Sequence, residues 1–76
     1  MGTPSAALQR LNRRQRDVLE LAARGLHNAE IGATLRISER TVRGYMSQLF
    51  LIFAVTNRTE LVGAWLGVAN GPRERG

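Results

Sequence analysis

The sequence predicts an all-α domain, a small bundle-like arrangement of four short helices. In four separate segments, apolar residues recur every three or four positions, the spacing that places them on one face of a helix. Each segment is preceded or followed by residues that begin or end helices. A length of 76 residues fits one small domain. We therefore expect one helical domain without strands.

The first two helices are expected at about residues 13–24 and 28–35. Asn12 is a suitable N-cap for the first, and Gly25 can adopt the left-handed conformation that ends it. Gly32 lies where the second and third helices would approach closely, at a cost of roughly 1 kcal/mol relative to alanine. The apolar faces are Val18, Leu21 and Ala22, with Leu19 and Ala23 beside them, in the first helix, and Ile31 and Leu35 in the second.

The third helix is expected to start after Ser38, a good N-cap, and to cover about residues 39–53. The run from Leu49 to Val55 is continuously apolar, as in a buried strand. We favour a helix because the helical spacing begins well upstream and continues through the run. The inner stripe of this helix is Val42, Met46, Leu49 and Phe53.

The fourth helix is expected to begin near Asn57 and to end near Gly67. Asn57 and Glu60 fit the N-cap and N3 positions of a capping box. We expect residues 1–10 to form an N-terminal tail or linker, residues 11–67 the domain, and residues 68–76 a C-terminal tail. The predicted apolar face is Leu61, Val62, Trp65 and Leu66.

The composition narrows the class of function. The net charge is +5 and every basic residue is an arginine, which favours a polyanionic partner. Without cysteine the chain has no disulfides and no thiolate metal site. The N-terminus has no signal-peptide core, and the longest apolar run is too short to span a bilayer. No catalytic constellation or phosphate-binding glycine loop is present, so we expect no enzyme, no cofactor and no metal.

The second and third helices, joined by a tight turn, form the pattern of a helix-turn-helix whose second helix enters the major groove of DNA. On a helical wheel, Arg43, Gly44 and Ser47 lie roughly opposite the apolar stripe, together with Arg40. Arginine can pair with guanine there, and glycine allows close approach to base edges. Arg40 and Thr41, in the first turn, are better placed for phosphates.

The segment from Leu11 to Trp65 resembles the LuxR-type, or GerE-type, DNA-binding domain of bacterial transcriptional regulators. The residues that match in order are Arg14, Val18-Leu19, Gly25-Leu26, Asn28, Glu30-Ile31, Leu35, Ile37-Ser38, Thr41-Val42-Arg43, Val55 and Asn57-Arg58-Thr59-Glu60. The resemblance implies a DNA-reading third helix and a fourth helix that often mediates dimerisation on inverted repeats. The positions that it assigns to bases are Arg43, Gly44 and Ser47, with Arg40 and Thr41 on the backbone and Asn28 and Arg58 as weaker backbone candidates.

Some positions depart from the family pattern. A basic residue is common where Ala29, Leu51 and Ile52 stand. Leu51 falls near the DNA-facing arc, and Ile52 lies on its flank. Both either contact a partner, pack under the fourth helix or are merely tolerated, and the expected dimer or partner interface is Leu51, Ile52, Val62 and Trp65. His27 replaces the usual serine or threonine cap, so Asn28 is a candidate cap in its place, and Gln15 replaces a common glutamate.

The expected function is sequence-specific binding of double-stranded DNA by a cytoplasmic transcriptional regulator, associated with the nucleoid through DNA. Further candidate partners are a second copy of the chain, RNA polymerase, and an N-terminal receiver or signal-binding domain in a longer parent; we expect no membrane partner. Two alternatives stay open. One is region 4 of a sigma factor, which shares the helix-turn-helix. The other is a protein-interaction module of the same fold with weakened DNA binding.

Overall fold

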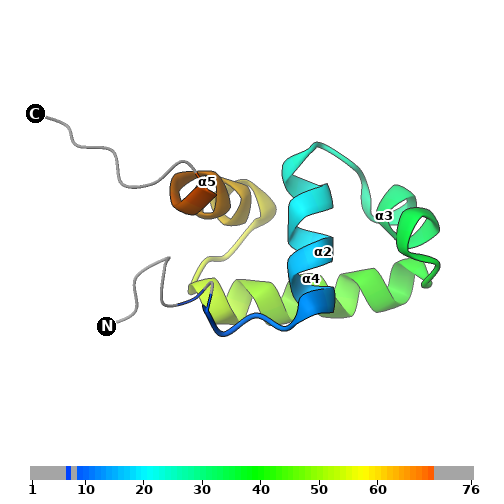
Figure 1. Ribbon diagram of the computed structural model, residues 1–76, viewed down its shortest axis with the longest axis horizontal. Helices are drawn as coiled ribbons and strands as arrows, with labels where there is room; N and C mark the ends of the chain where they lie inside the picture. The colour runs from blue at the N-terminus through cyan, green and yellow to red at the C-terminus, as the bar shows by residue number, and fades with distance from the viewer. Residues whose placement is uncertain (1–6, 8, 70–76) are drawn as a thin grey trace, which may run out of the picture.

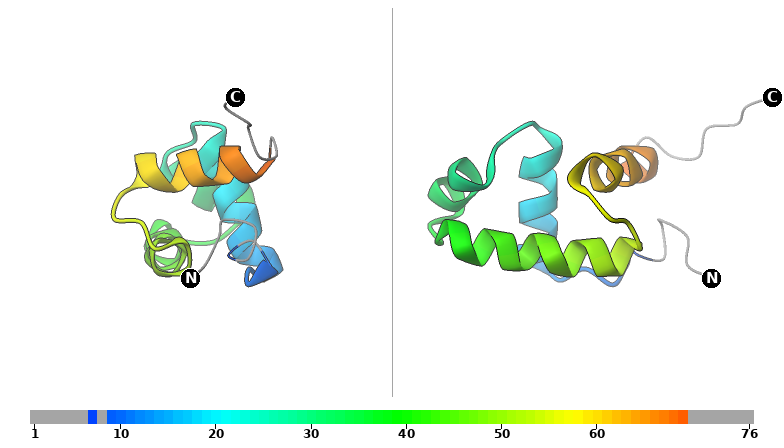
Figure 2. Two further views of the ribbon diagram at one scale, coloured as in Figure 1. Left: turned by 90° about the vertical axis from the view of Figure 1, so that its left-hand side faces the viewer. Right: turned by 180° about the vertical axis from the view of Figure 1, so that it is seen from behind.

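Four helices make up most of the described chain (Figure 1). The computed structural model describes residues 7 and 9–69, and no strand occurs among them, so the all-α prediction is confirmed. The longest helix, α4, runs along one side of the domain, α2 crosses it, and α3 and α5 lie on opposite sides of α2 (Figures 1 and 2). The bounds are α2 Arg13–Ala23, α3 Asn28–Leu35, α4 Glu39–Phe53 and α5 Arg58–Ala69.

Side-chain caps begin α2 and α4 as predicted. Asn12 Oδ1 accepts a hydrogen bond from the Gln15 N–H at 2.8 Å, and Gln15 Oε1 accepts from the Asn12 N–H at 3.0 Å. These two bonds complete a capping box at the start of α2. Ser38 Oγ accepts from the Thr41 N–H at 3.0 Å, which satisfies one of the unpaired donors in the first turn of α4.

The starts of α3 and α5 differ in part from the prediction. Asn28 does not cap α3; the N-cap is His27, because Glu30 Oε1 accepts from the His27 N–H at 2.7 Å and so anchors the helix one residue earlier. Asn57 caps α5 as predicted, with its Oδ1 2.9 Å from the Glu60 nitrogen. The Glu60 carboxylate, however, accepts from the N–H and hydroxyl of Thr56, two donors that converge on one oxygen.

Left-handed residues follow three of the helices. Their φ angles are 95° at Gly25, 62° at Arg36 and 57° at Ala54. Gly25 confirms the predicted end of the first helix. Arg36 and Ala54 each carry a Cβ that crowds the next carbonyl in this conformation, at a cost of roughly 1–2 kcal/mol.

The turn between α3 and α4 lies directly on Gly32. A Cβ at this position would be 2.7 Å from the Ile37 carbonyl oxygen, a contact that a real side chain does not make. The Ile37 N–H donates to the Gly32 carbonyl at 2.9 Å. The predicted close approach is therefore confirmed, and it sets the angle at which α4 leaves the turn.

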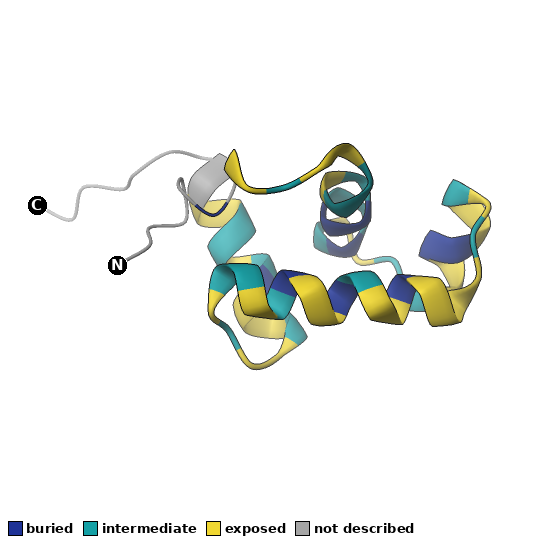
Figure 3. Ribbon diagram, turned by 90° about the horizontal axis from the view of Figure 1, so that it is seen from below, coloured by how far each residue is buried: buried dark blue, intermediate teal, exposed yellow. Residues whose placement is uncertain are grey.

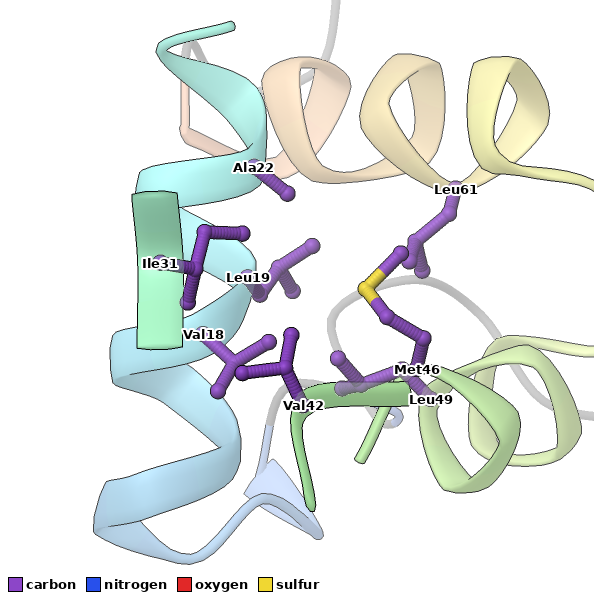
Figure 4. Packing of buried hydrophobic residues seen from close by; sticks show 8 residues of the cluster. All are labelled: Val18, Leu19, Ala22, Ile31, Val42, Met46, Leu49 and Leu61. Atoms are coloured by element: carbon purple, nitrogen blue, oxygen red, sulfur yellow. The ribbon is translucent and has the colours of Figure 1, made fainter. Parts of the chain in front are cut away.

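The hydrophobic core joins all four helices. In Figure 4 the side chain of Met46 extends from α4 toward Leu61 of α5, whereas Val42 lies beside Val18 of α2. Of the predicted inner stripe of α4, three residues are buried and Phe53 is half-buried against the core. The cluster consists of Val18, Leu19, Ala22, Ile31, Val42, Met46, Leu49 and Leu61.

Two details of the predicted core, and the end of one helix, differ from the prediction. Leu19, expected beside the apolar face of the first helix, is fully buried. Leu66, expected on the apolar face of the fourth helix, is 44% exposed. That helix also extends to Ala69 rather than ending near Gly67. The sequence of α5 is apolar around most of its circumference, so its pattern does not select which side is buried.

The tail expected at residues 1–10 lies mostly outside the described residues. Within it Ala7 is buried, and the Arg10 N–H donates to the Ala7 carbonyl at 2.9 Å. In the described part of the chain, no single helix is long and apolar enough to cross a membrane. By length and composition, α4 and the part of α5 up to Gly67 would suffice only together, and the two are bent by 60° relative to each other.

Candidate nucleic-acid interface

The outer face of α4 collects the residues predicted to contact DNA. The core holds α4 through Val42, Met46 and Leu49, which leaves the opposite side to solvent. In Figure 3 exposed and buried positions alternate along this helix, which runs horizontally through the view. The residues that the structure brings together on the exposed side are Arg40, Thr41, Arg43, Gly44 and Ser47, all of them exposed.

Arg43 has an acidic partner on its own helix. Its Nη1 lies 3.1 Å from Glu39 Oε2, one turn earlier, and about half or more of each side chain is exposed. Such an exposed pair stabilises a helix by roughly 0.3–0.5 kcal/mol. The pair directs the guanidinium along the exposed face, and exchanging the carboxylate for another acceptor costs little. Sequence reasoning missed Glu39, although the four-residue spacing of the two charges was a readable signal.

Thr41 keeps a hydrogen-bond donor for an outside partner. The Ser38 hydroxyl donates to Thr41 Oγ1 at 2.9 Å, so the Thr41 oxygen acts as an acceptor within the cap. Its own hydroxyl hydrogen is then available to an acceptor such as a phosphate oxygen. Because Thr41 is exposed in the first turn of α4, that donor lies where the helix dipole also favours an anion.

Gly44 has no structural role within the domain. A Cβ built on it meets nothing within 4 Å, in contrast to Gly32. Glycine in a helix interior costs roughly 1 kcal/mol relative to alanine. That cost has no compensation among the described residues, which suits a position kept open for another molecule.

Asn28 and Arg58 lie beside this face, but they also bond to each other. Arg58 Nη1 donates to Asn28 Oδ1 at 3.2 Å, and Arg58 Nη2 donates to the Leu26 carbonyl. These bonds connect the first turn of α5 to the start of α3. Both residues line a hollow whose other walls are Arg43, Met46, Ser47 and Phe50. The hollow thus places Asn28 and Arg58, the weaker candidates for DNA contact, next to Arg43 and Ser47, which are stronger candidates.

A second hollow adjoins the outer face of α4 and adds Gln48, which sequence reasoning missed. Its walls are Thr41, Gly44, Tyr45 and Gln48. Gln48 Oε1 accepts from Gln15 Nε2 at 2.9 Å, so α2 holds this amide in place. The position of Gln48 one turn after Gly44 could have indicated that it lies on the outer face of α4. Its bond to Gln15 could not be predicted, because the two residues are 33 positions apart in the sequence.

The residues predicted to form a dimer or partner interface differ in their surroundings. Leu51 is 82% exposed, so it does not pack under the fourth helix. Ile52 and Val62 are half-buried. Trp65 is half-buried and packs against the core, which gives it a structural role as well.

α5 also exposes two glycines. Gly63 and Gly67 are both exposed, four positions apart, and a Cβ on either would meet nothing within 4 Å. They lie on one side of the helix because residues four apart are neighbours on a helix surface. Within residues 7 and 9–69, no group of three or more acidic or histidine side chains is arranged to hold a metal ion.

Comparison with known proteins identifies the family. The pattern described as "Bacterial regulatory proteins, luxR family" matches residues 9–64. Response regulator Rre1 of Synechocystis sp. is 43% identical over 60 residues, which cover 79% of this chain and 26% of that protein. The probable HTH-type transcriptional regulator GfsR of Streptomyces halstedii is 33% identical over 69 residues, covering 91% of this chain and 27% of GfsR.

A further relative is the two-component response regulator PprB of Pseudomonas aeruginosa. It is 40% identical over 52 residues, which cover 68% of this chain and 19% of PprB. This chain therefore spans about a fifth to a quarter of the length of the curated relatives described here. The family match decides between the two helix-turn-helix interpretations, in favour of the LuxR type and against region 4 of a sigma factor.

Proposed function

The chain belongs to the luxR family of bacterial regulatory proteins, and we propose that it is the DNA-binding domain of a transcriptional regulator. One observation carries the proposal. The face of α4 opposite the buried stripe is exposed and bears arginines, two hydroxyl side chains and a glycine. A helix about 10–12 Å across fits a major groove about 12 Å wide. We propose that residues 39–53 lie in that groove and bind double-stranded DNA in a sequence-specific manner.

Arg43 is the proposed principal reader of base identity. Its guanidinium can donate two hydrogen bonds to O6 and N7 of guanine. The exposed pair with Glu39 is weak enough to be exchanged for this contact. Glu39 is then able to accept from the N4 amino group of a cytosine. Ser47, one turn after Arg43, is the second proposed base contact, and Gly44 lets the helix come close to the base edges.

Backbone contacts are proposed for two groups of residues. Arg40 and Thr41 reach one strand from the first turn of α4, where Thr41 retains its hydroxyl donor. Asn28 and Arg58 reach the backbone from the adjoining hollow. Because Arg58 already donates to Asn28 and to the Leu26 carbonyl, its proposed role is to hold the Asn28 amide toward a phosphate as much as to supply charge.

α5 is the proposed dimer contact. The exposed Gly63 and Gly67 allow another helix to approach closely, and Val62 and Trp65 supply half-buried apolar surface on the same helix. Two copies related by a two-fold axis would place their α4 helices on the two halves of an inverted repeat. A single module offers a small contact area, so pairing raises the affinity for such a site.

Partners beyond DNA follow from the relatives. Rre1 and PprB are described as response regulators, and this chain spans only part of their length. We propose an N-terminal receiver or signal-binding domain in a longer parent protein, and RNA polymerase as the machinery on which the bound regulator acts.

Backbone amide mapping tests the placement of α4 directly. The uniformly ¹⁵N-labelled domain is titrated with a short duplex, and changes in the amide signals are followed by NMR. We expect the largest changes at residues 38–51, with smaller changes at Asn28 and Arg58 and none at the end of α2 that lies away from α4 in Figure 1. Changes confined to α5 or to α2 would contradict the proposal.

A second candidate function is a protein-interaction module of the same fold. The observation that favours it is the exposure of Leu51, together with the absence of a basic side chain at Ala29, Leu51 and Ile52. This function predicts weak DNA binding even at low salt, with no change in the amides of α4 upon titration.

A further inference from the structure

Leu51 lies on the same side of α4 as the residues proposed to meet DNA, one turn beyond Ser47. It follows Gly44 by seven residues and Ser47 by four. At about 100° per residue, these positions share one side of α4, opposite the buried stripe. Leu51 is 82% exposed, the largest exposed fraction among the large apolar side chains of the described residues. Single exposed leucines are common on protein surfaces, so the position of Leu51 on this side of α4, rather than its exposure alone, is the observation that matters.

The direction of the side chain keeps it over the groove. In an α-helix the Cα–Cβ bond tilts toward the N-terminus, so a long side chain covers the turn that precedes it. Leu51 therefore covers the surface beside Ser47 and Gln48 rather than extending past the end of α4 at Phe53. Along the helix axis it lies about 10 Å beyond Gly44.

The chemistry of the groove restricts what Leu51 can contact. The edges of the bases offer hydrogen-bond donors and acceptors and a single kind of apolar group, the 5-methyl group of thymine. A leucine side chain makes no hydrogen bonds, so in the groove it gains free energy only by burial against that methyl. We propose that Leu51 recognises thymine through its 5-methyl group and extends the half-site beyond the bases read by Arg43. This inference rests on the proposed function of α4.

A protein partner fits the surroundings of Leu51 less well. One turn earlier its neighbours are Ser47 and Gln48, both polar and exposed, and Gln48 is held by Gln15. Ile52 is half-buried and does not belong to the packed core, so it adds little exposed apolar area. The patch is one leucine in a polar setting, whereas the centre of a stable protein interface is a larger apolar area.

Removing one methyl group at a time from the DNA tests this inference. A duplex is first selected with the unmodified protein, and each thymine in a half-site is then replaced by deoxyuridine, which lacks only the 5-methyl group. We expect one position at which the affinity of the unmodified protein falls about four-fold, the value for one buried methyl group. Leu51→Ala should bind the parent duplex more weakly by a similar factor and lose its sensitivity at that position.

Arg43→Ala is the matched control. It should bind more weakly overall but keep the four-fold sensitivity to deoxyuridine, because Leu51 is unchanged. Far-UV circular dichroism and thermal unfolding should show that Leu51→Ala folds like the unmodified protein, since the side chain is exposed.

Three outcomes would overturn the inference. If Leu51→Ala keeps the full sensitivity at every thymine while Arg43→Ala loses affinity, Leu51 does not read thymine although α4 reads DNA. If Arg43→Ala binds as well as the unmodified protein, the proposed function fails and this inference fails with it. If Leu51→Ala alters only the sedimentation of the protein and not its discrimination of thymine, Leu51 is a protein contact.

Discussion

Replacing Gly44 with alanine is expected to stabilise the domain and to weaken its binding to DNA. Gly44 lies inside α4, and a Cβ built on it meets nothing within 4 Å. Without a steric penalty, the substitution gains the difference in helix propensity, roughly 1 kcal/mol in the free energy of unfolding. In a domain of this size that gain raises the Tm by about 4–8 °C.

Gly32→Ala is the matched control, with the opposite expectation. The new Cβ would lie 2.7 Å from the Ile37 carbonyl oxygen, a backbone atom that cannot move unless the turn into α4 moves. We expect a loss of about 1–3 kcal/mol from overpacking despite the same gain in helix propensity. Thermal and urea unfolding, followed by far-UV circular dichroism, measure both variants. A lower Tm for Gly44→Ala, or a higher Tm for Gly32→Ala, would refute the packing described for these glycines.

The effect of Gly44→Ala on DNA completes the prediction. In the proposed complex Gly44 lies where α4 comes closest to the bases, so an added methyl group would hold the helix away from several contacts at once. We expect an affinity loss of roughly ten-fold, equivalent to about 1.4 kcal/mol, measured by fluorescence anisotropy on a selected duplex. A variant that is more stable and binds with unchanged affinity would show that Gly44 does not face DNA.

Further substitutions test three other features of the domain. Ala54→Gly should raise the free energy of unfolding by about 1 kcal/mol because Ala54 has a φ of 57°. Gly25→Ala, at a φ of 95°, should lower the free energy of unfolding by a similar amount. Thermal unfolding measures both variants, and a Tm that shifts in the same direction for the two would contradict this expectation. Arg58→Ala should lower stability by about 1–2 kcal/mol, because it removes the bonds from α5 to Asn28 and to the Leu26 carbonyl; an unchanged urea midpoint would argue against that connection. Arg40→Ala should reduce the slope of log affinity against log salt by about 0.9 per domain, whereas Arg24→Ala should leave it unchanged; equal slopes for the two would refute the phosphate contact at Arg40.

Local signals were sufficient to predict the helices. Asn12, Ser38 and Asn57 each precede an apolar periodic segment, and each accepts a hydrogen bond from a backbone N–H three residues later. A cap of this kind involves only neighbouring residues, so the sequence contains the whole interaction. Gly32 was predictable for a related reason, since its turn partner Ile37 is five residues away.

Interactions between distant segments were not predictable in the same way. Arg58 and Asn28 are 30 positions apart, and each looks like an unpaired polar residue near a helix start. Only the folded arrangement, in which the long Arg58 side chain reaches from the start of α5 to Asn28, makes them partners. The prediction of which α5 residues are buried was partly wrong for a different reason. The helix is apolar on both sides, so its sequence did not indicate that Leu61 is buried and Leu66 is exposed. The position of Leu51 on the outer arc was predicted, but its exposure required the structure.

The central proposal is that the exposed face of α4 reads the sequence of double-stranded DNA. The measurement that tests this most directly is selection from a pool of random duplexes at several salt concentrations, with the unmodified domain, Arg43→Ala and Arg24→Ala. Arg24→Ala removes an equal charge at the end of α2 that lies away from α4 (Figure 1). We predict that the unmodified domain and Arg24→Ala enrich the same inverted repeat, and that Arg43→Ala binds more weakly and loses the preference at the base pair that Arg43 is proposed to read. Enrichment of the same repeat by Arg43→Ala, or of no sequence by the unmodified domain, would contradict the assignment.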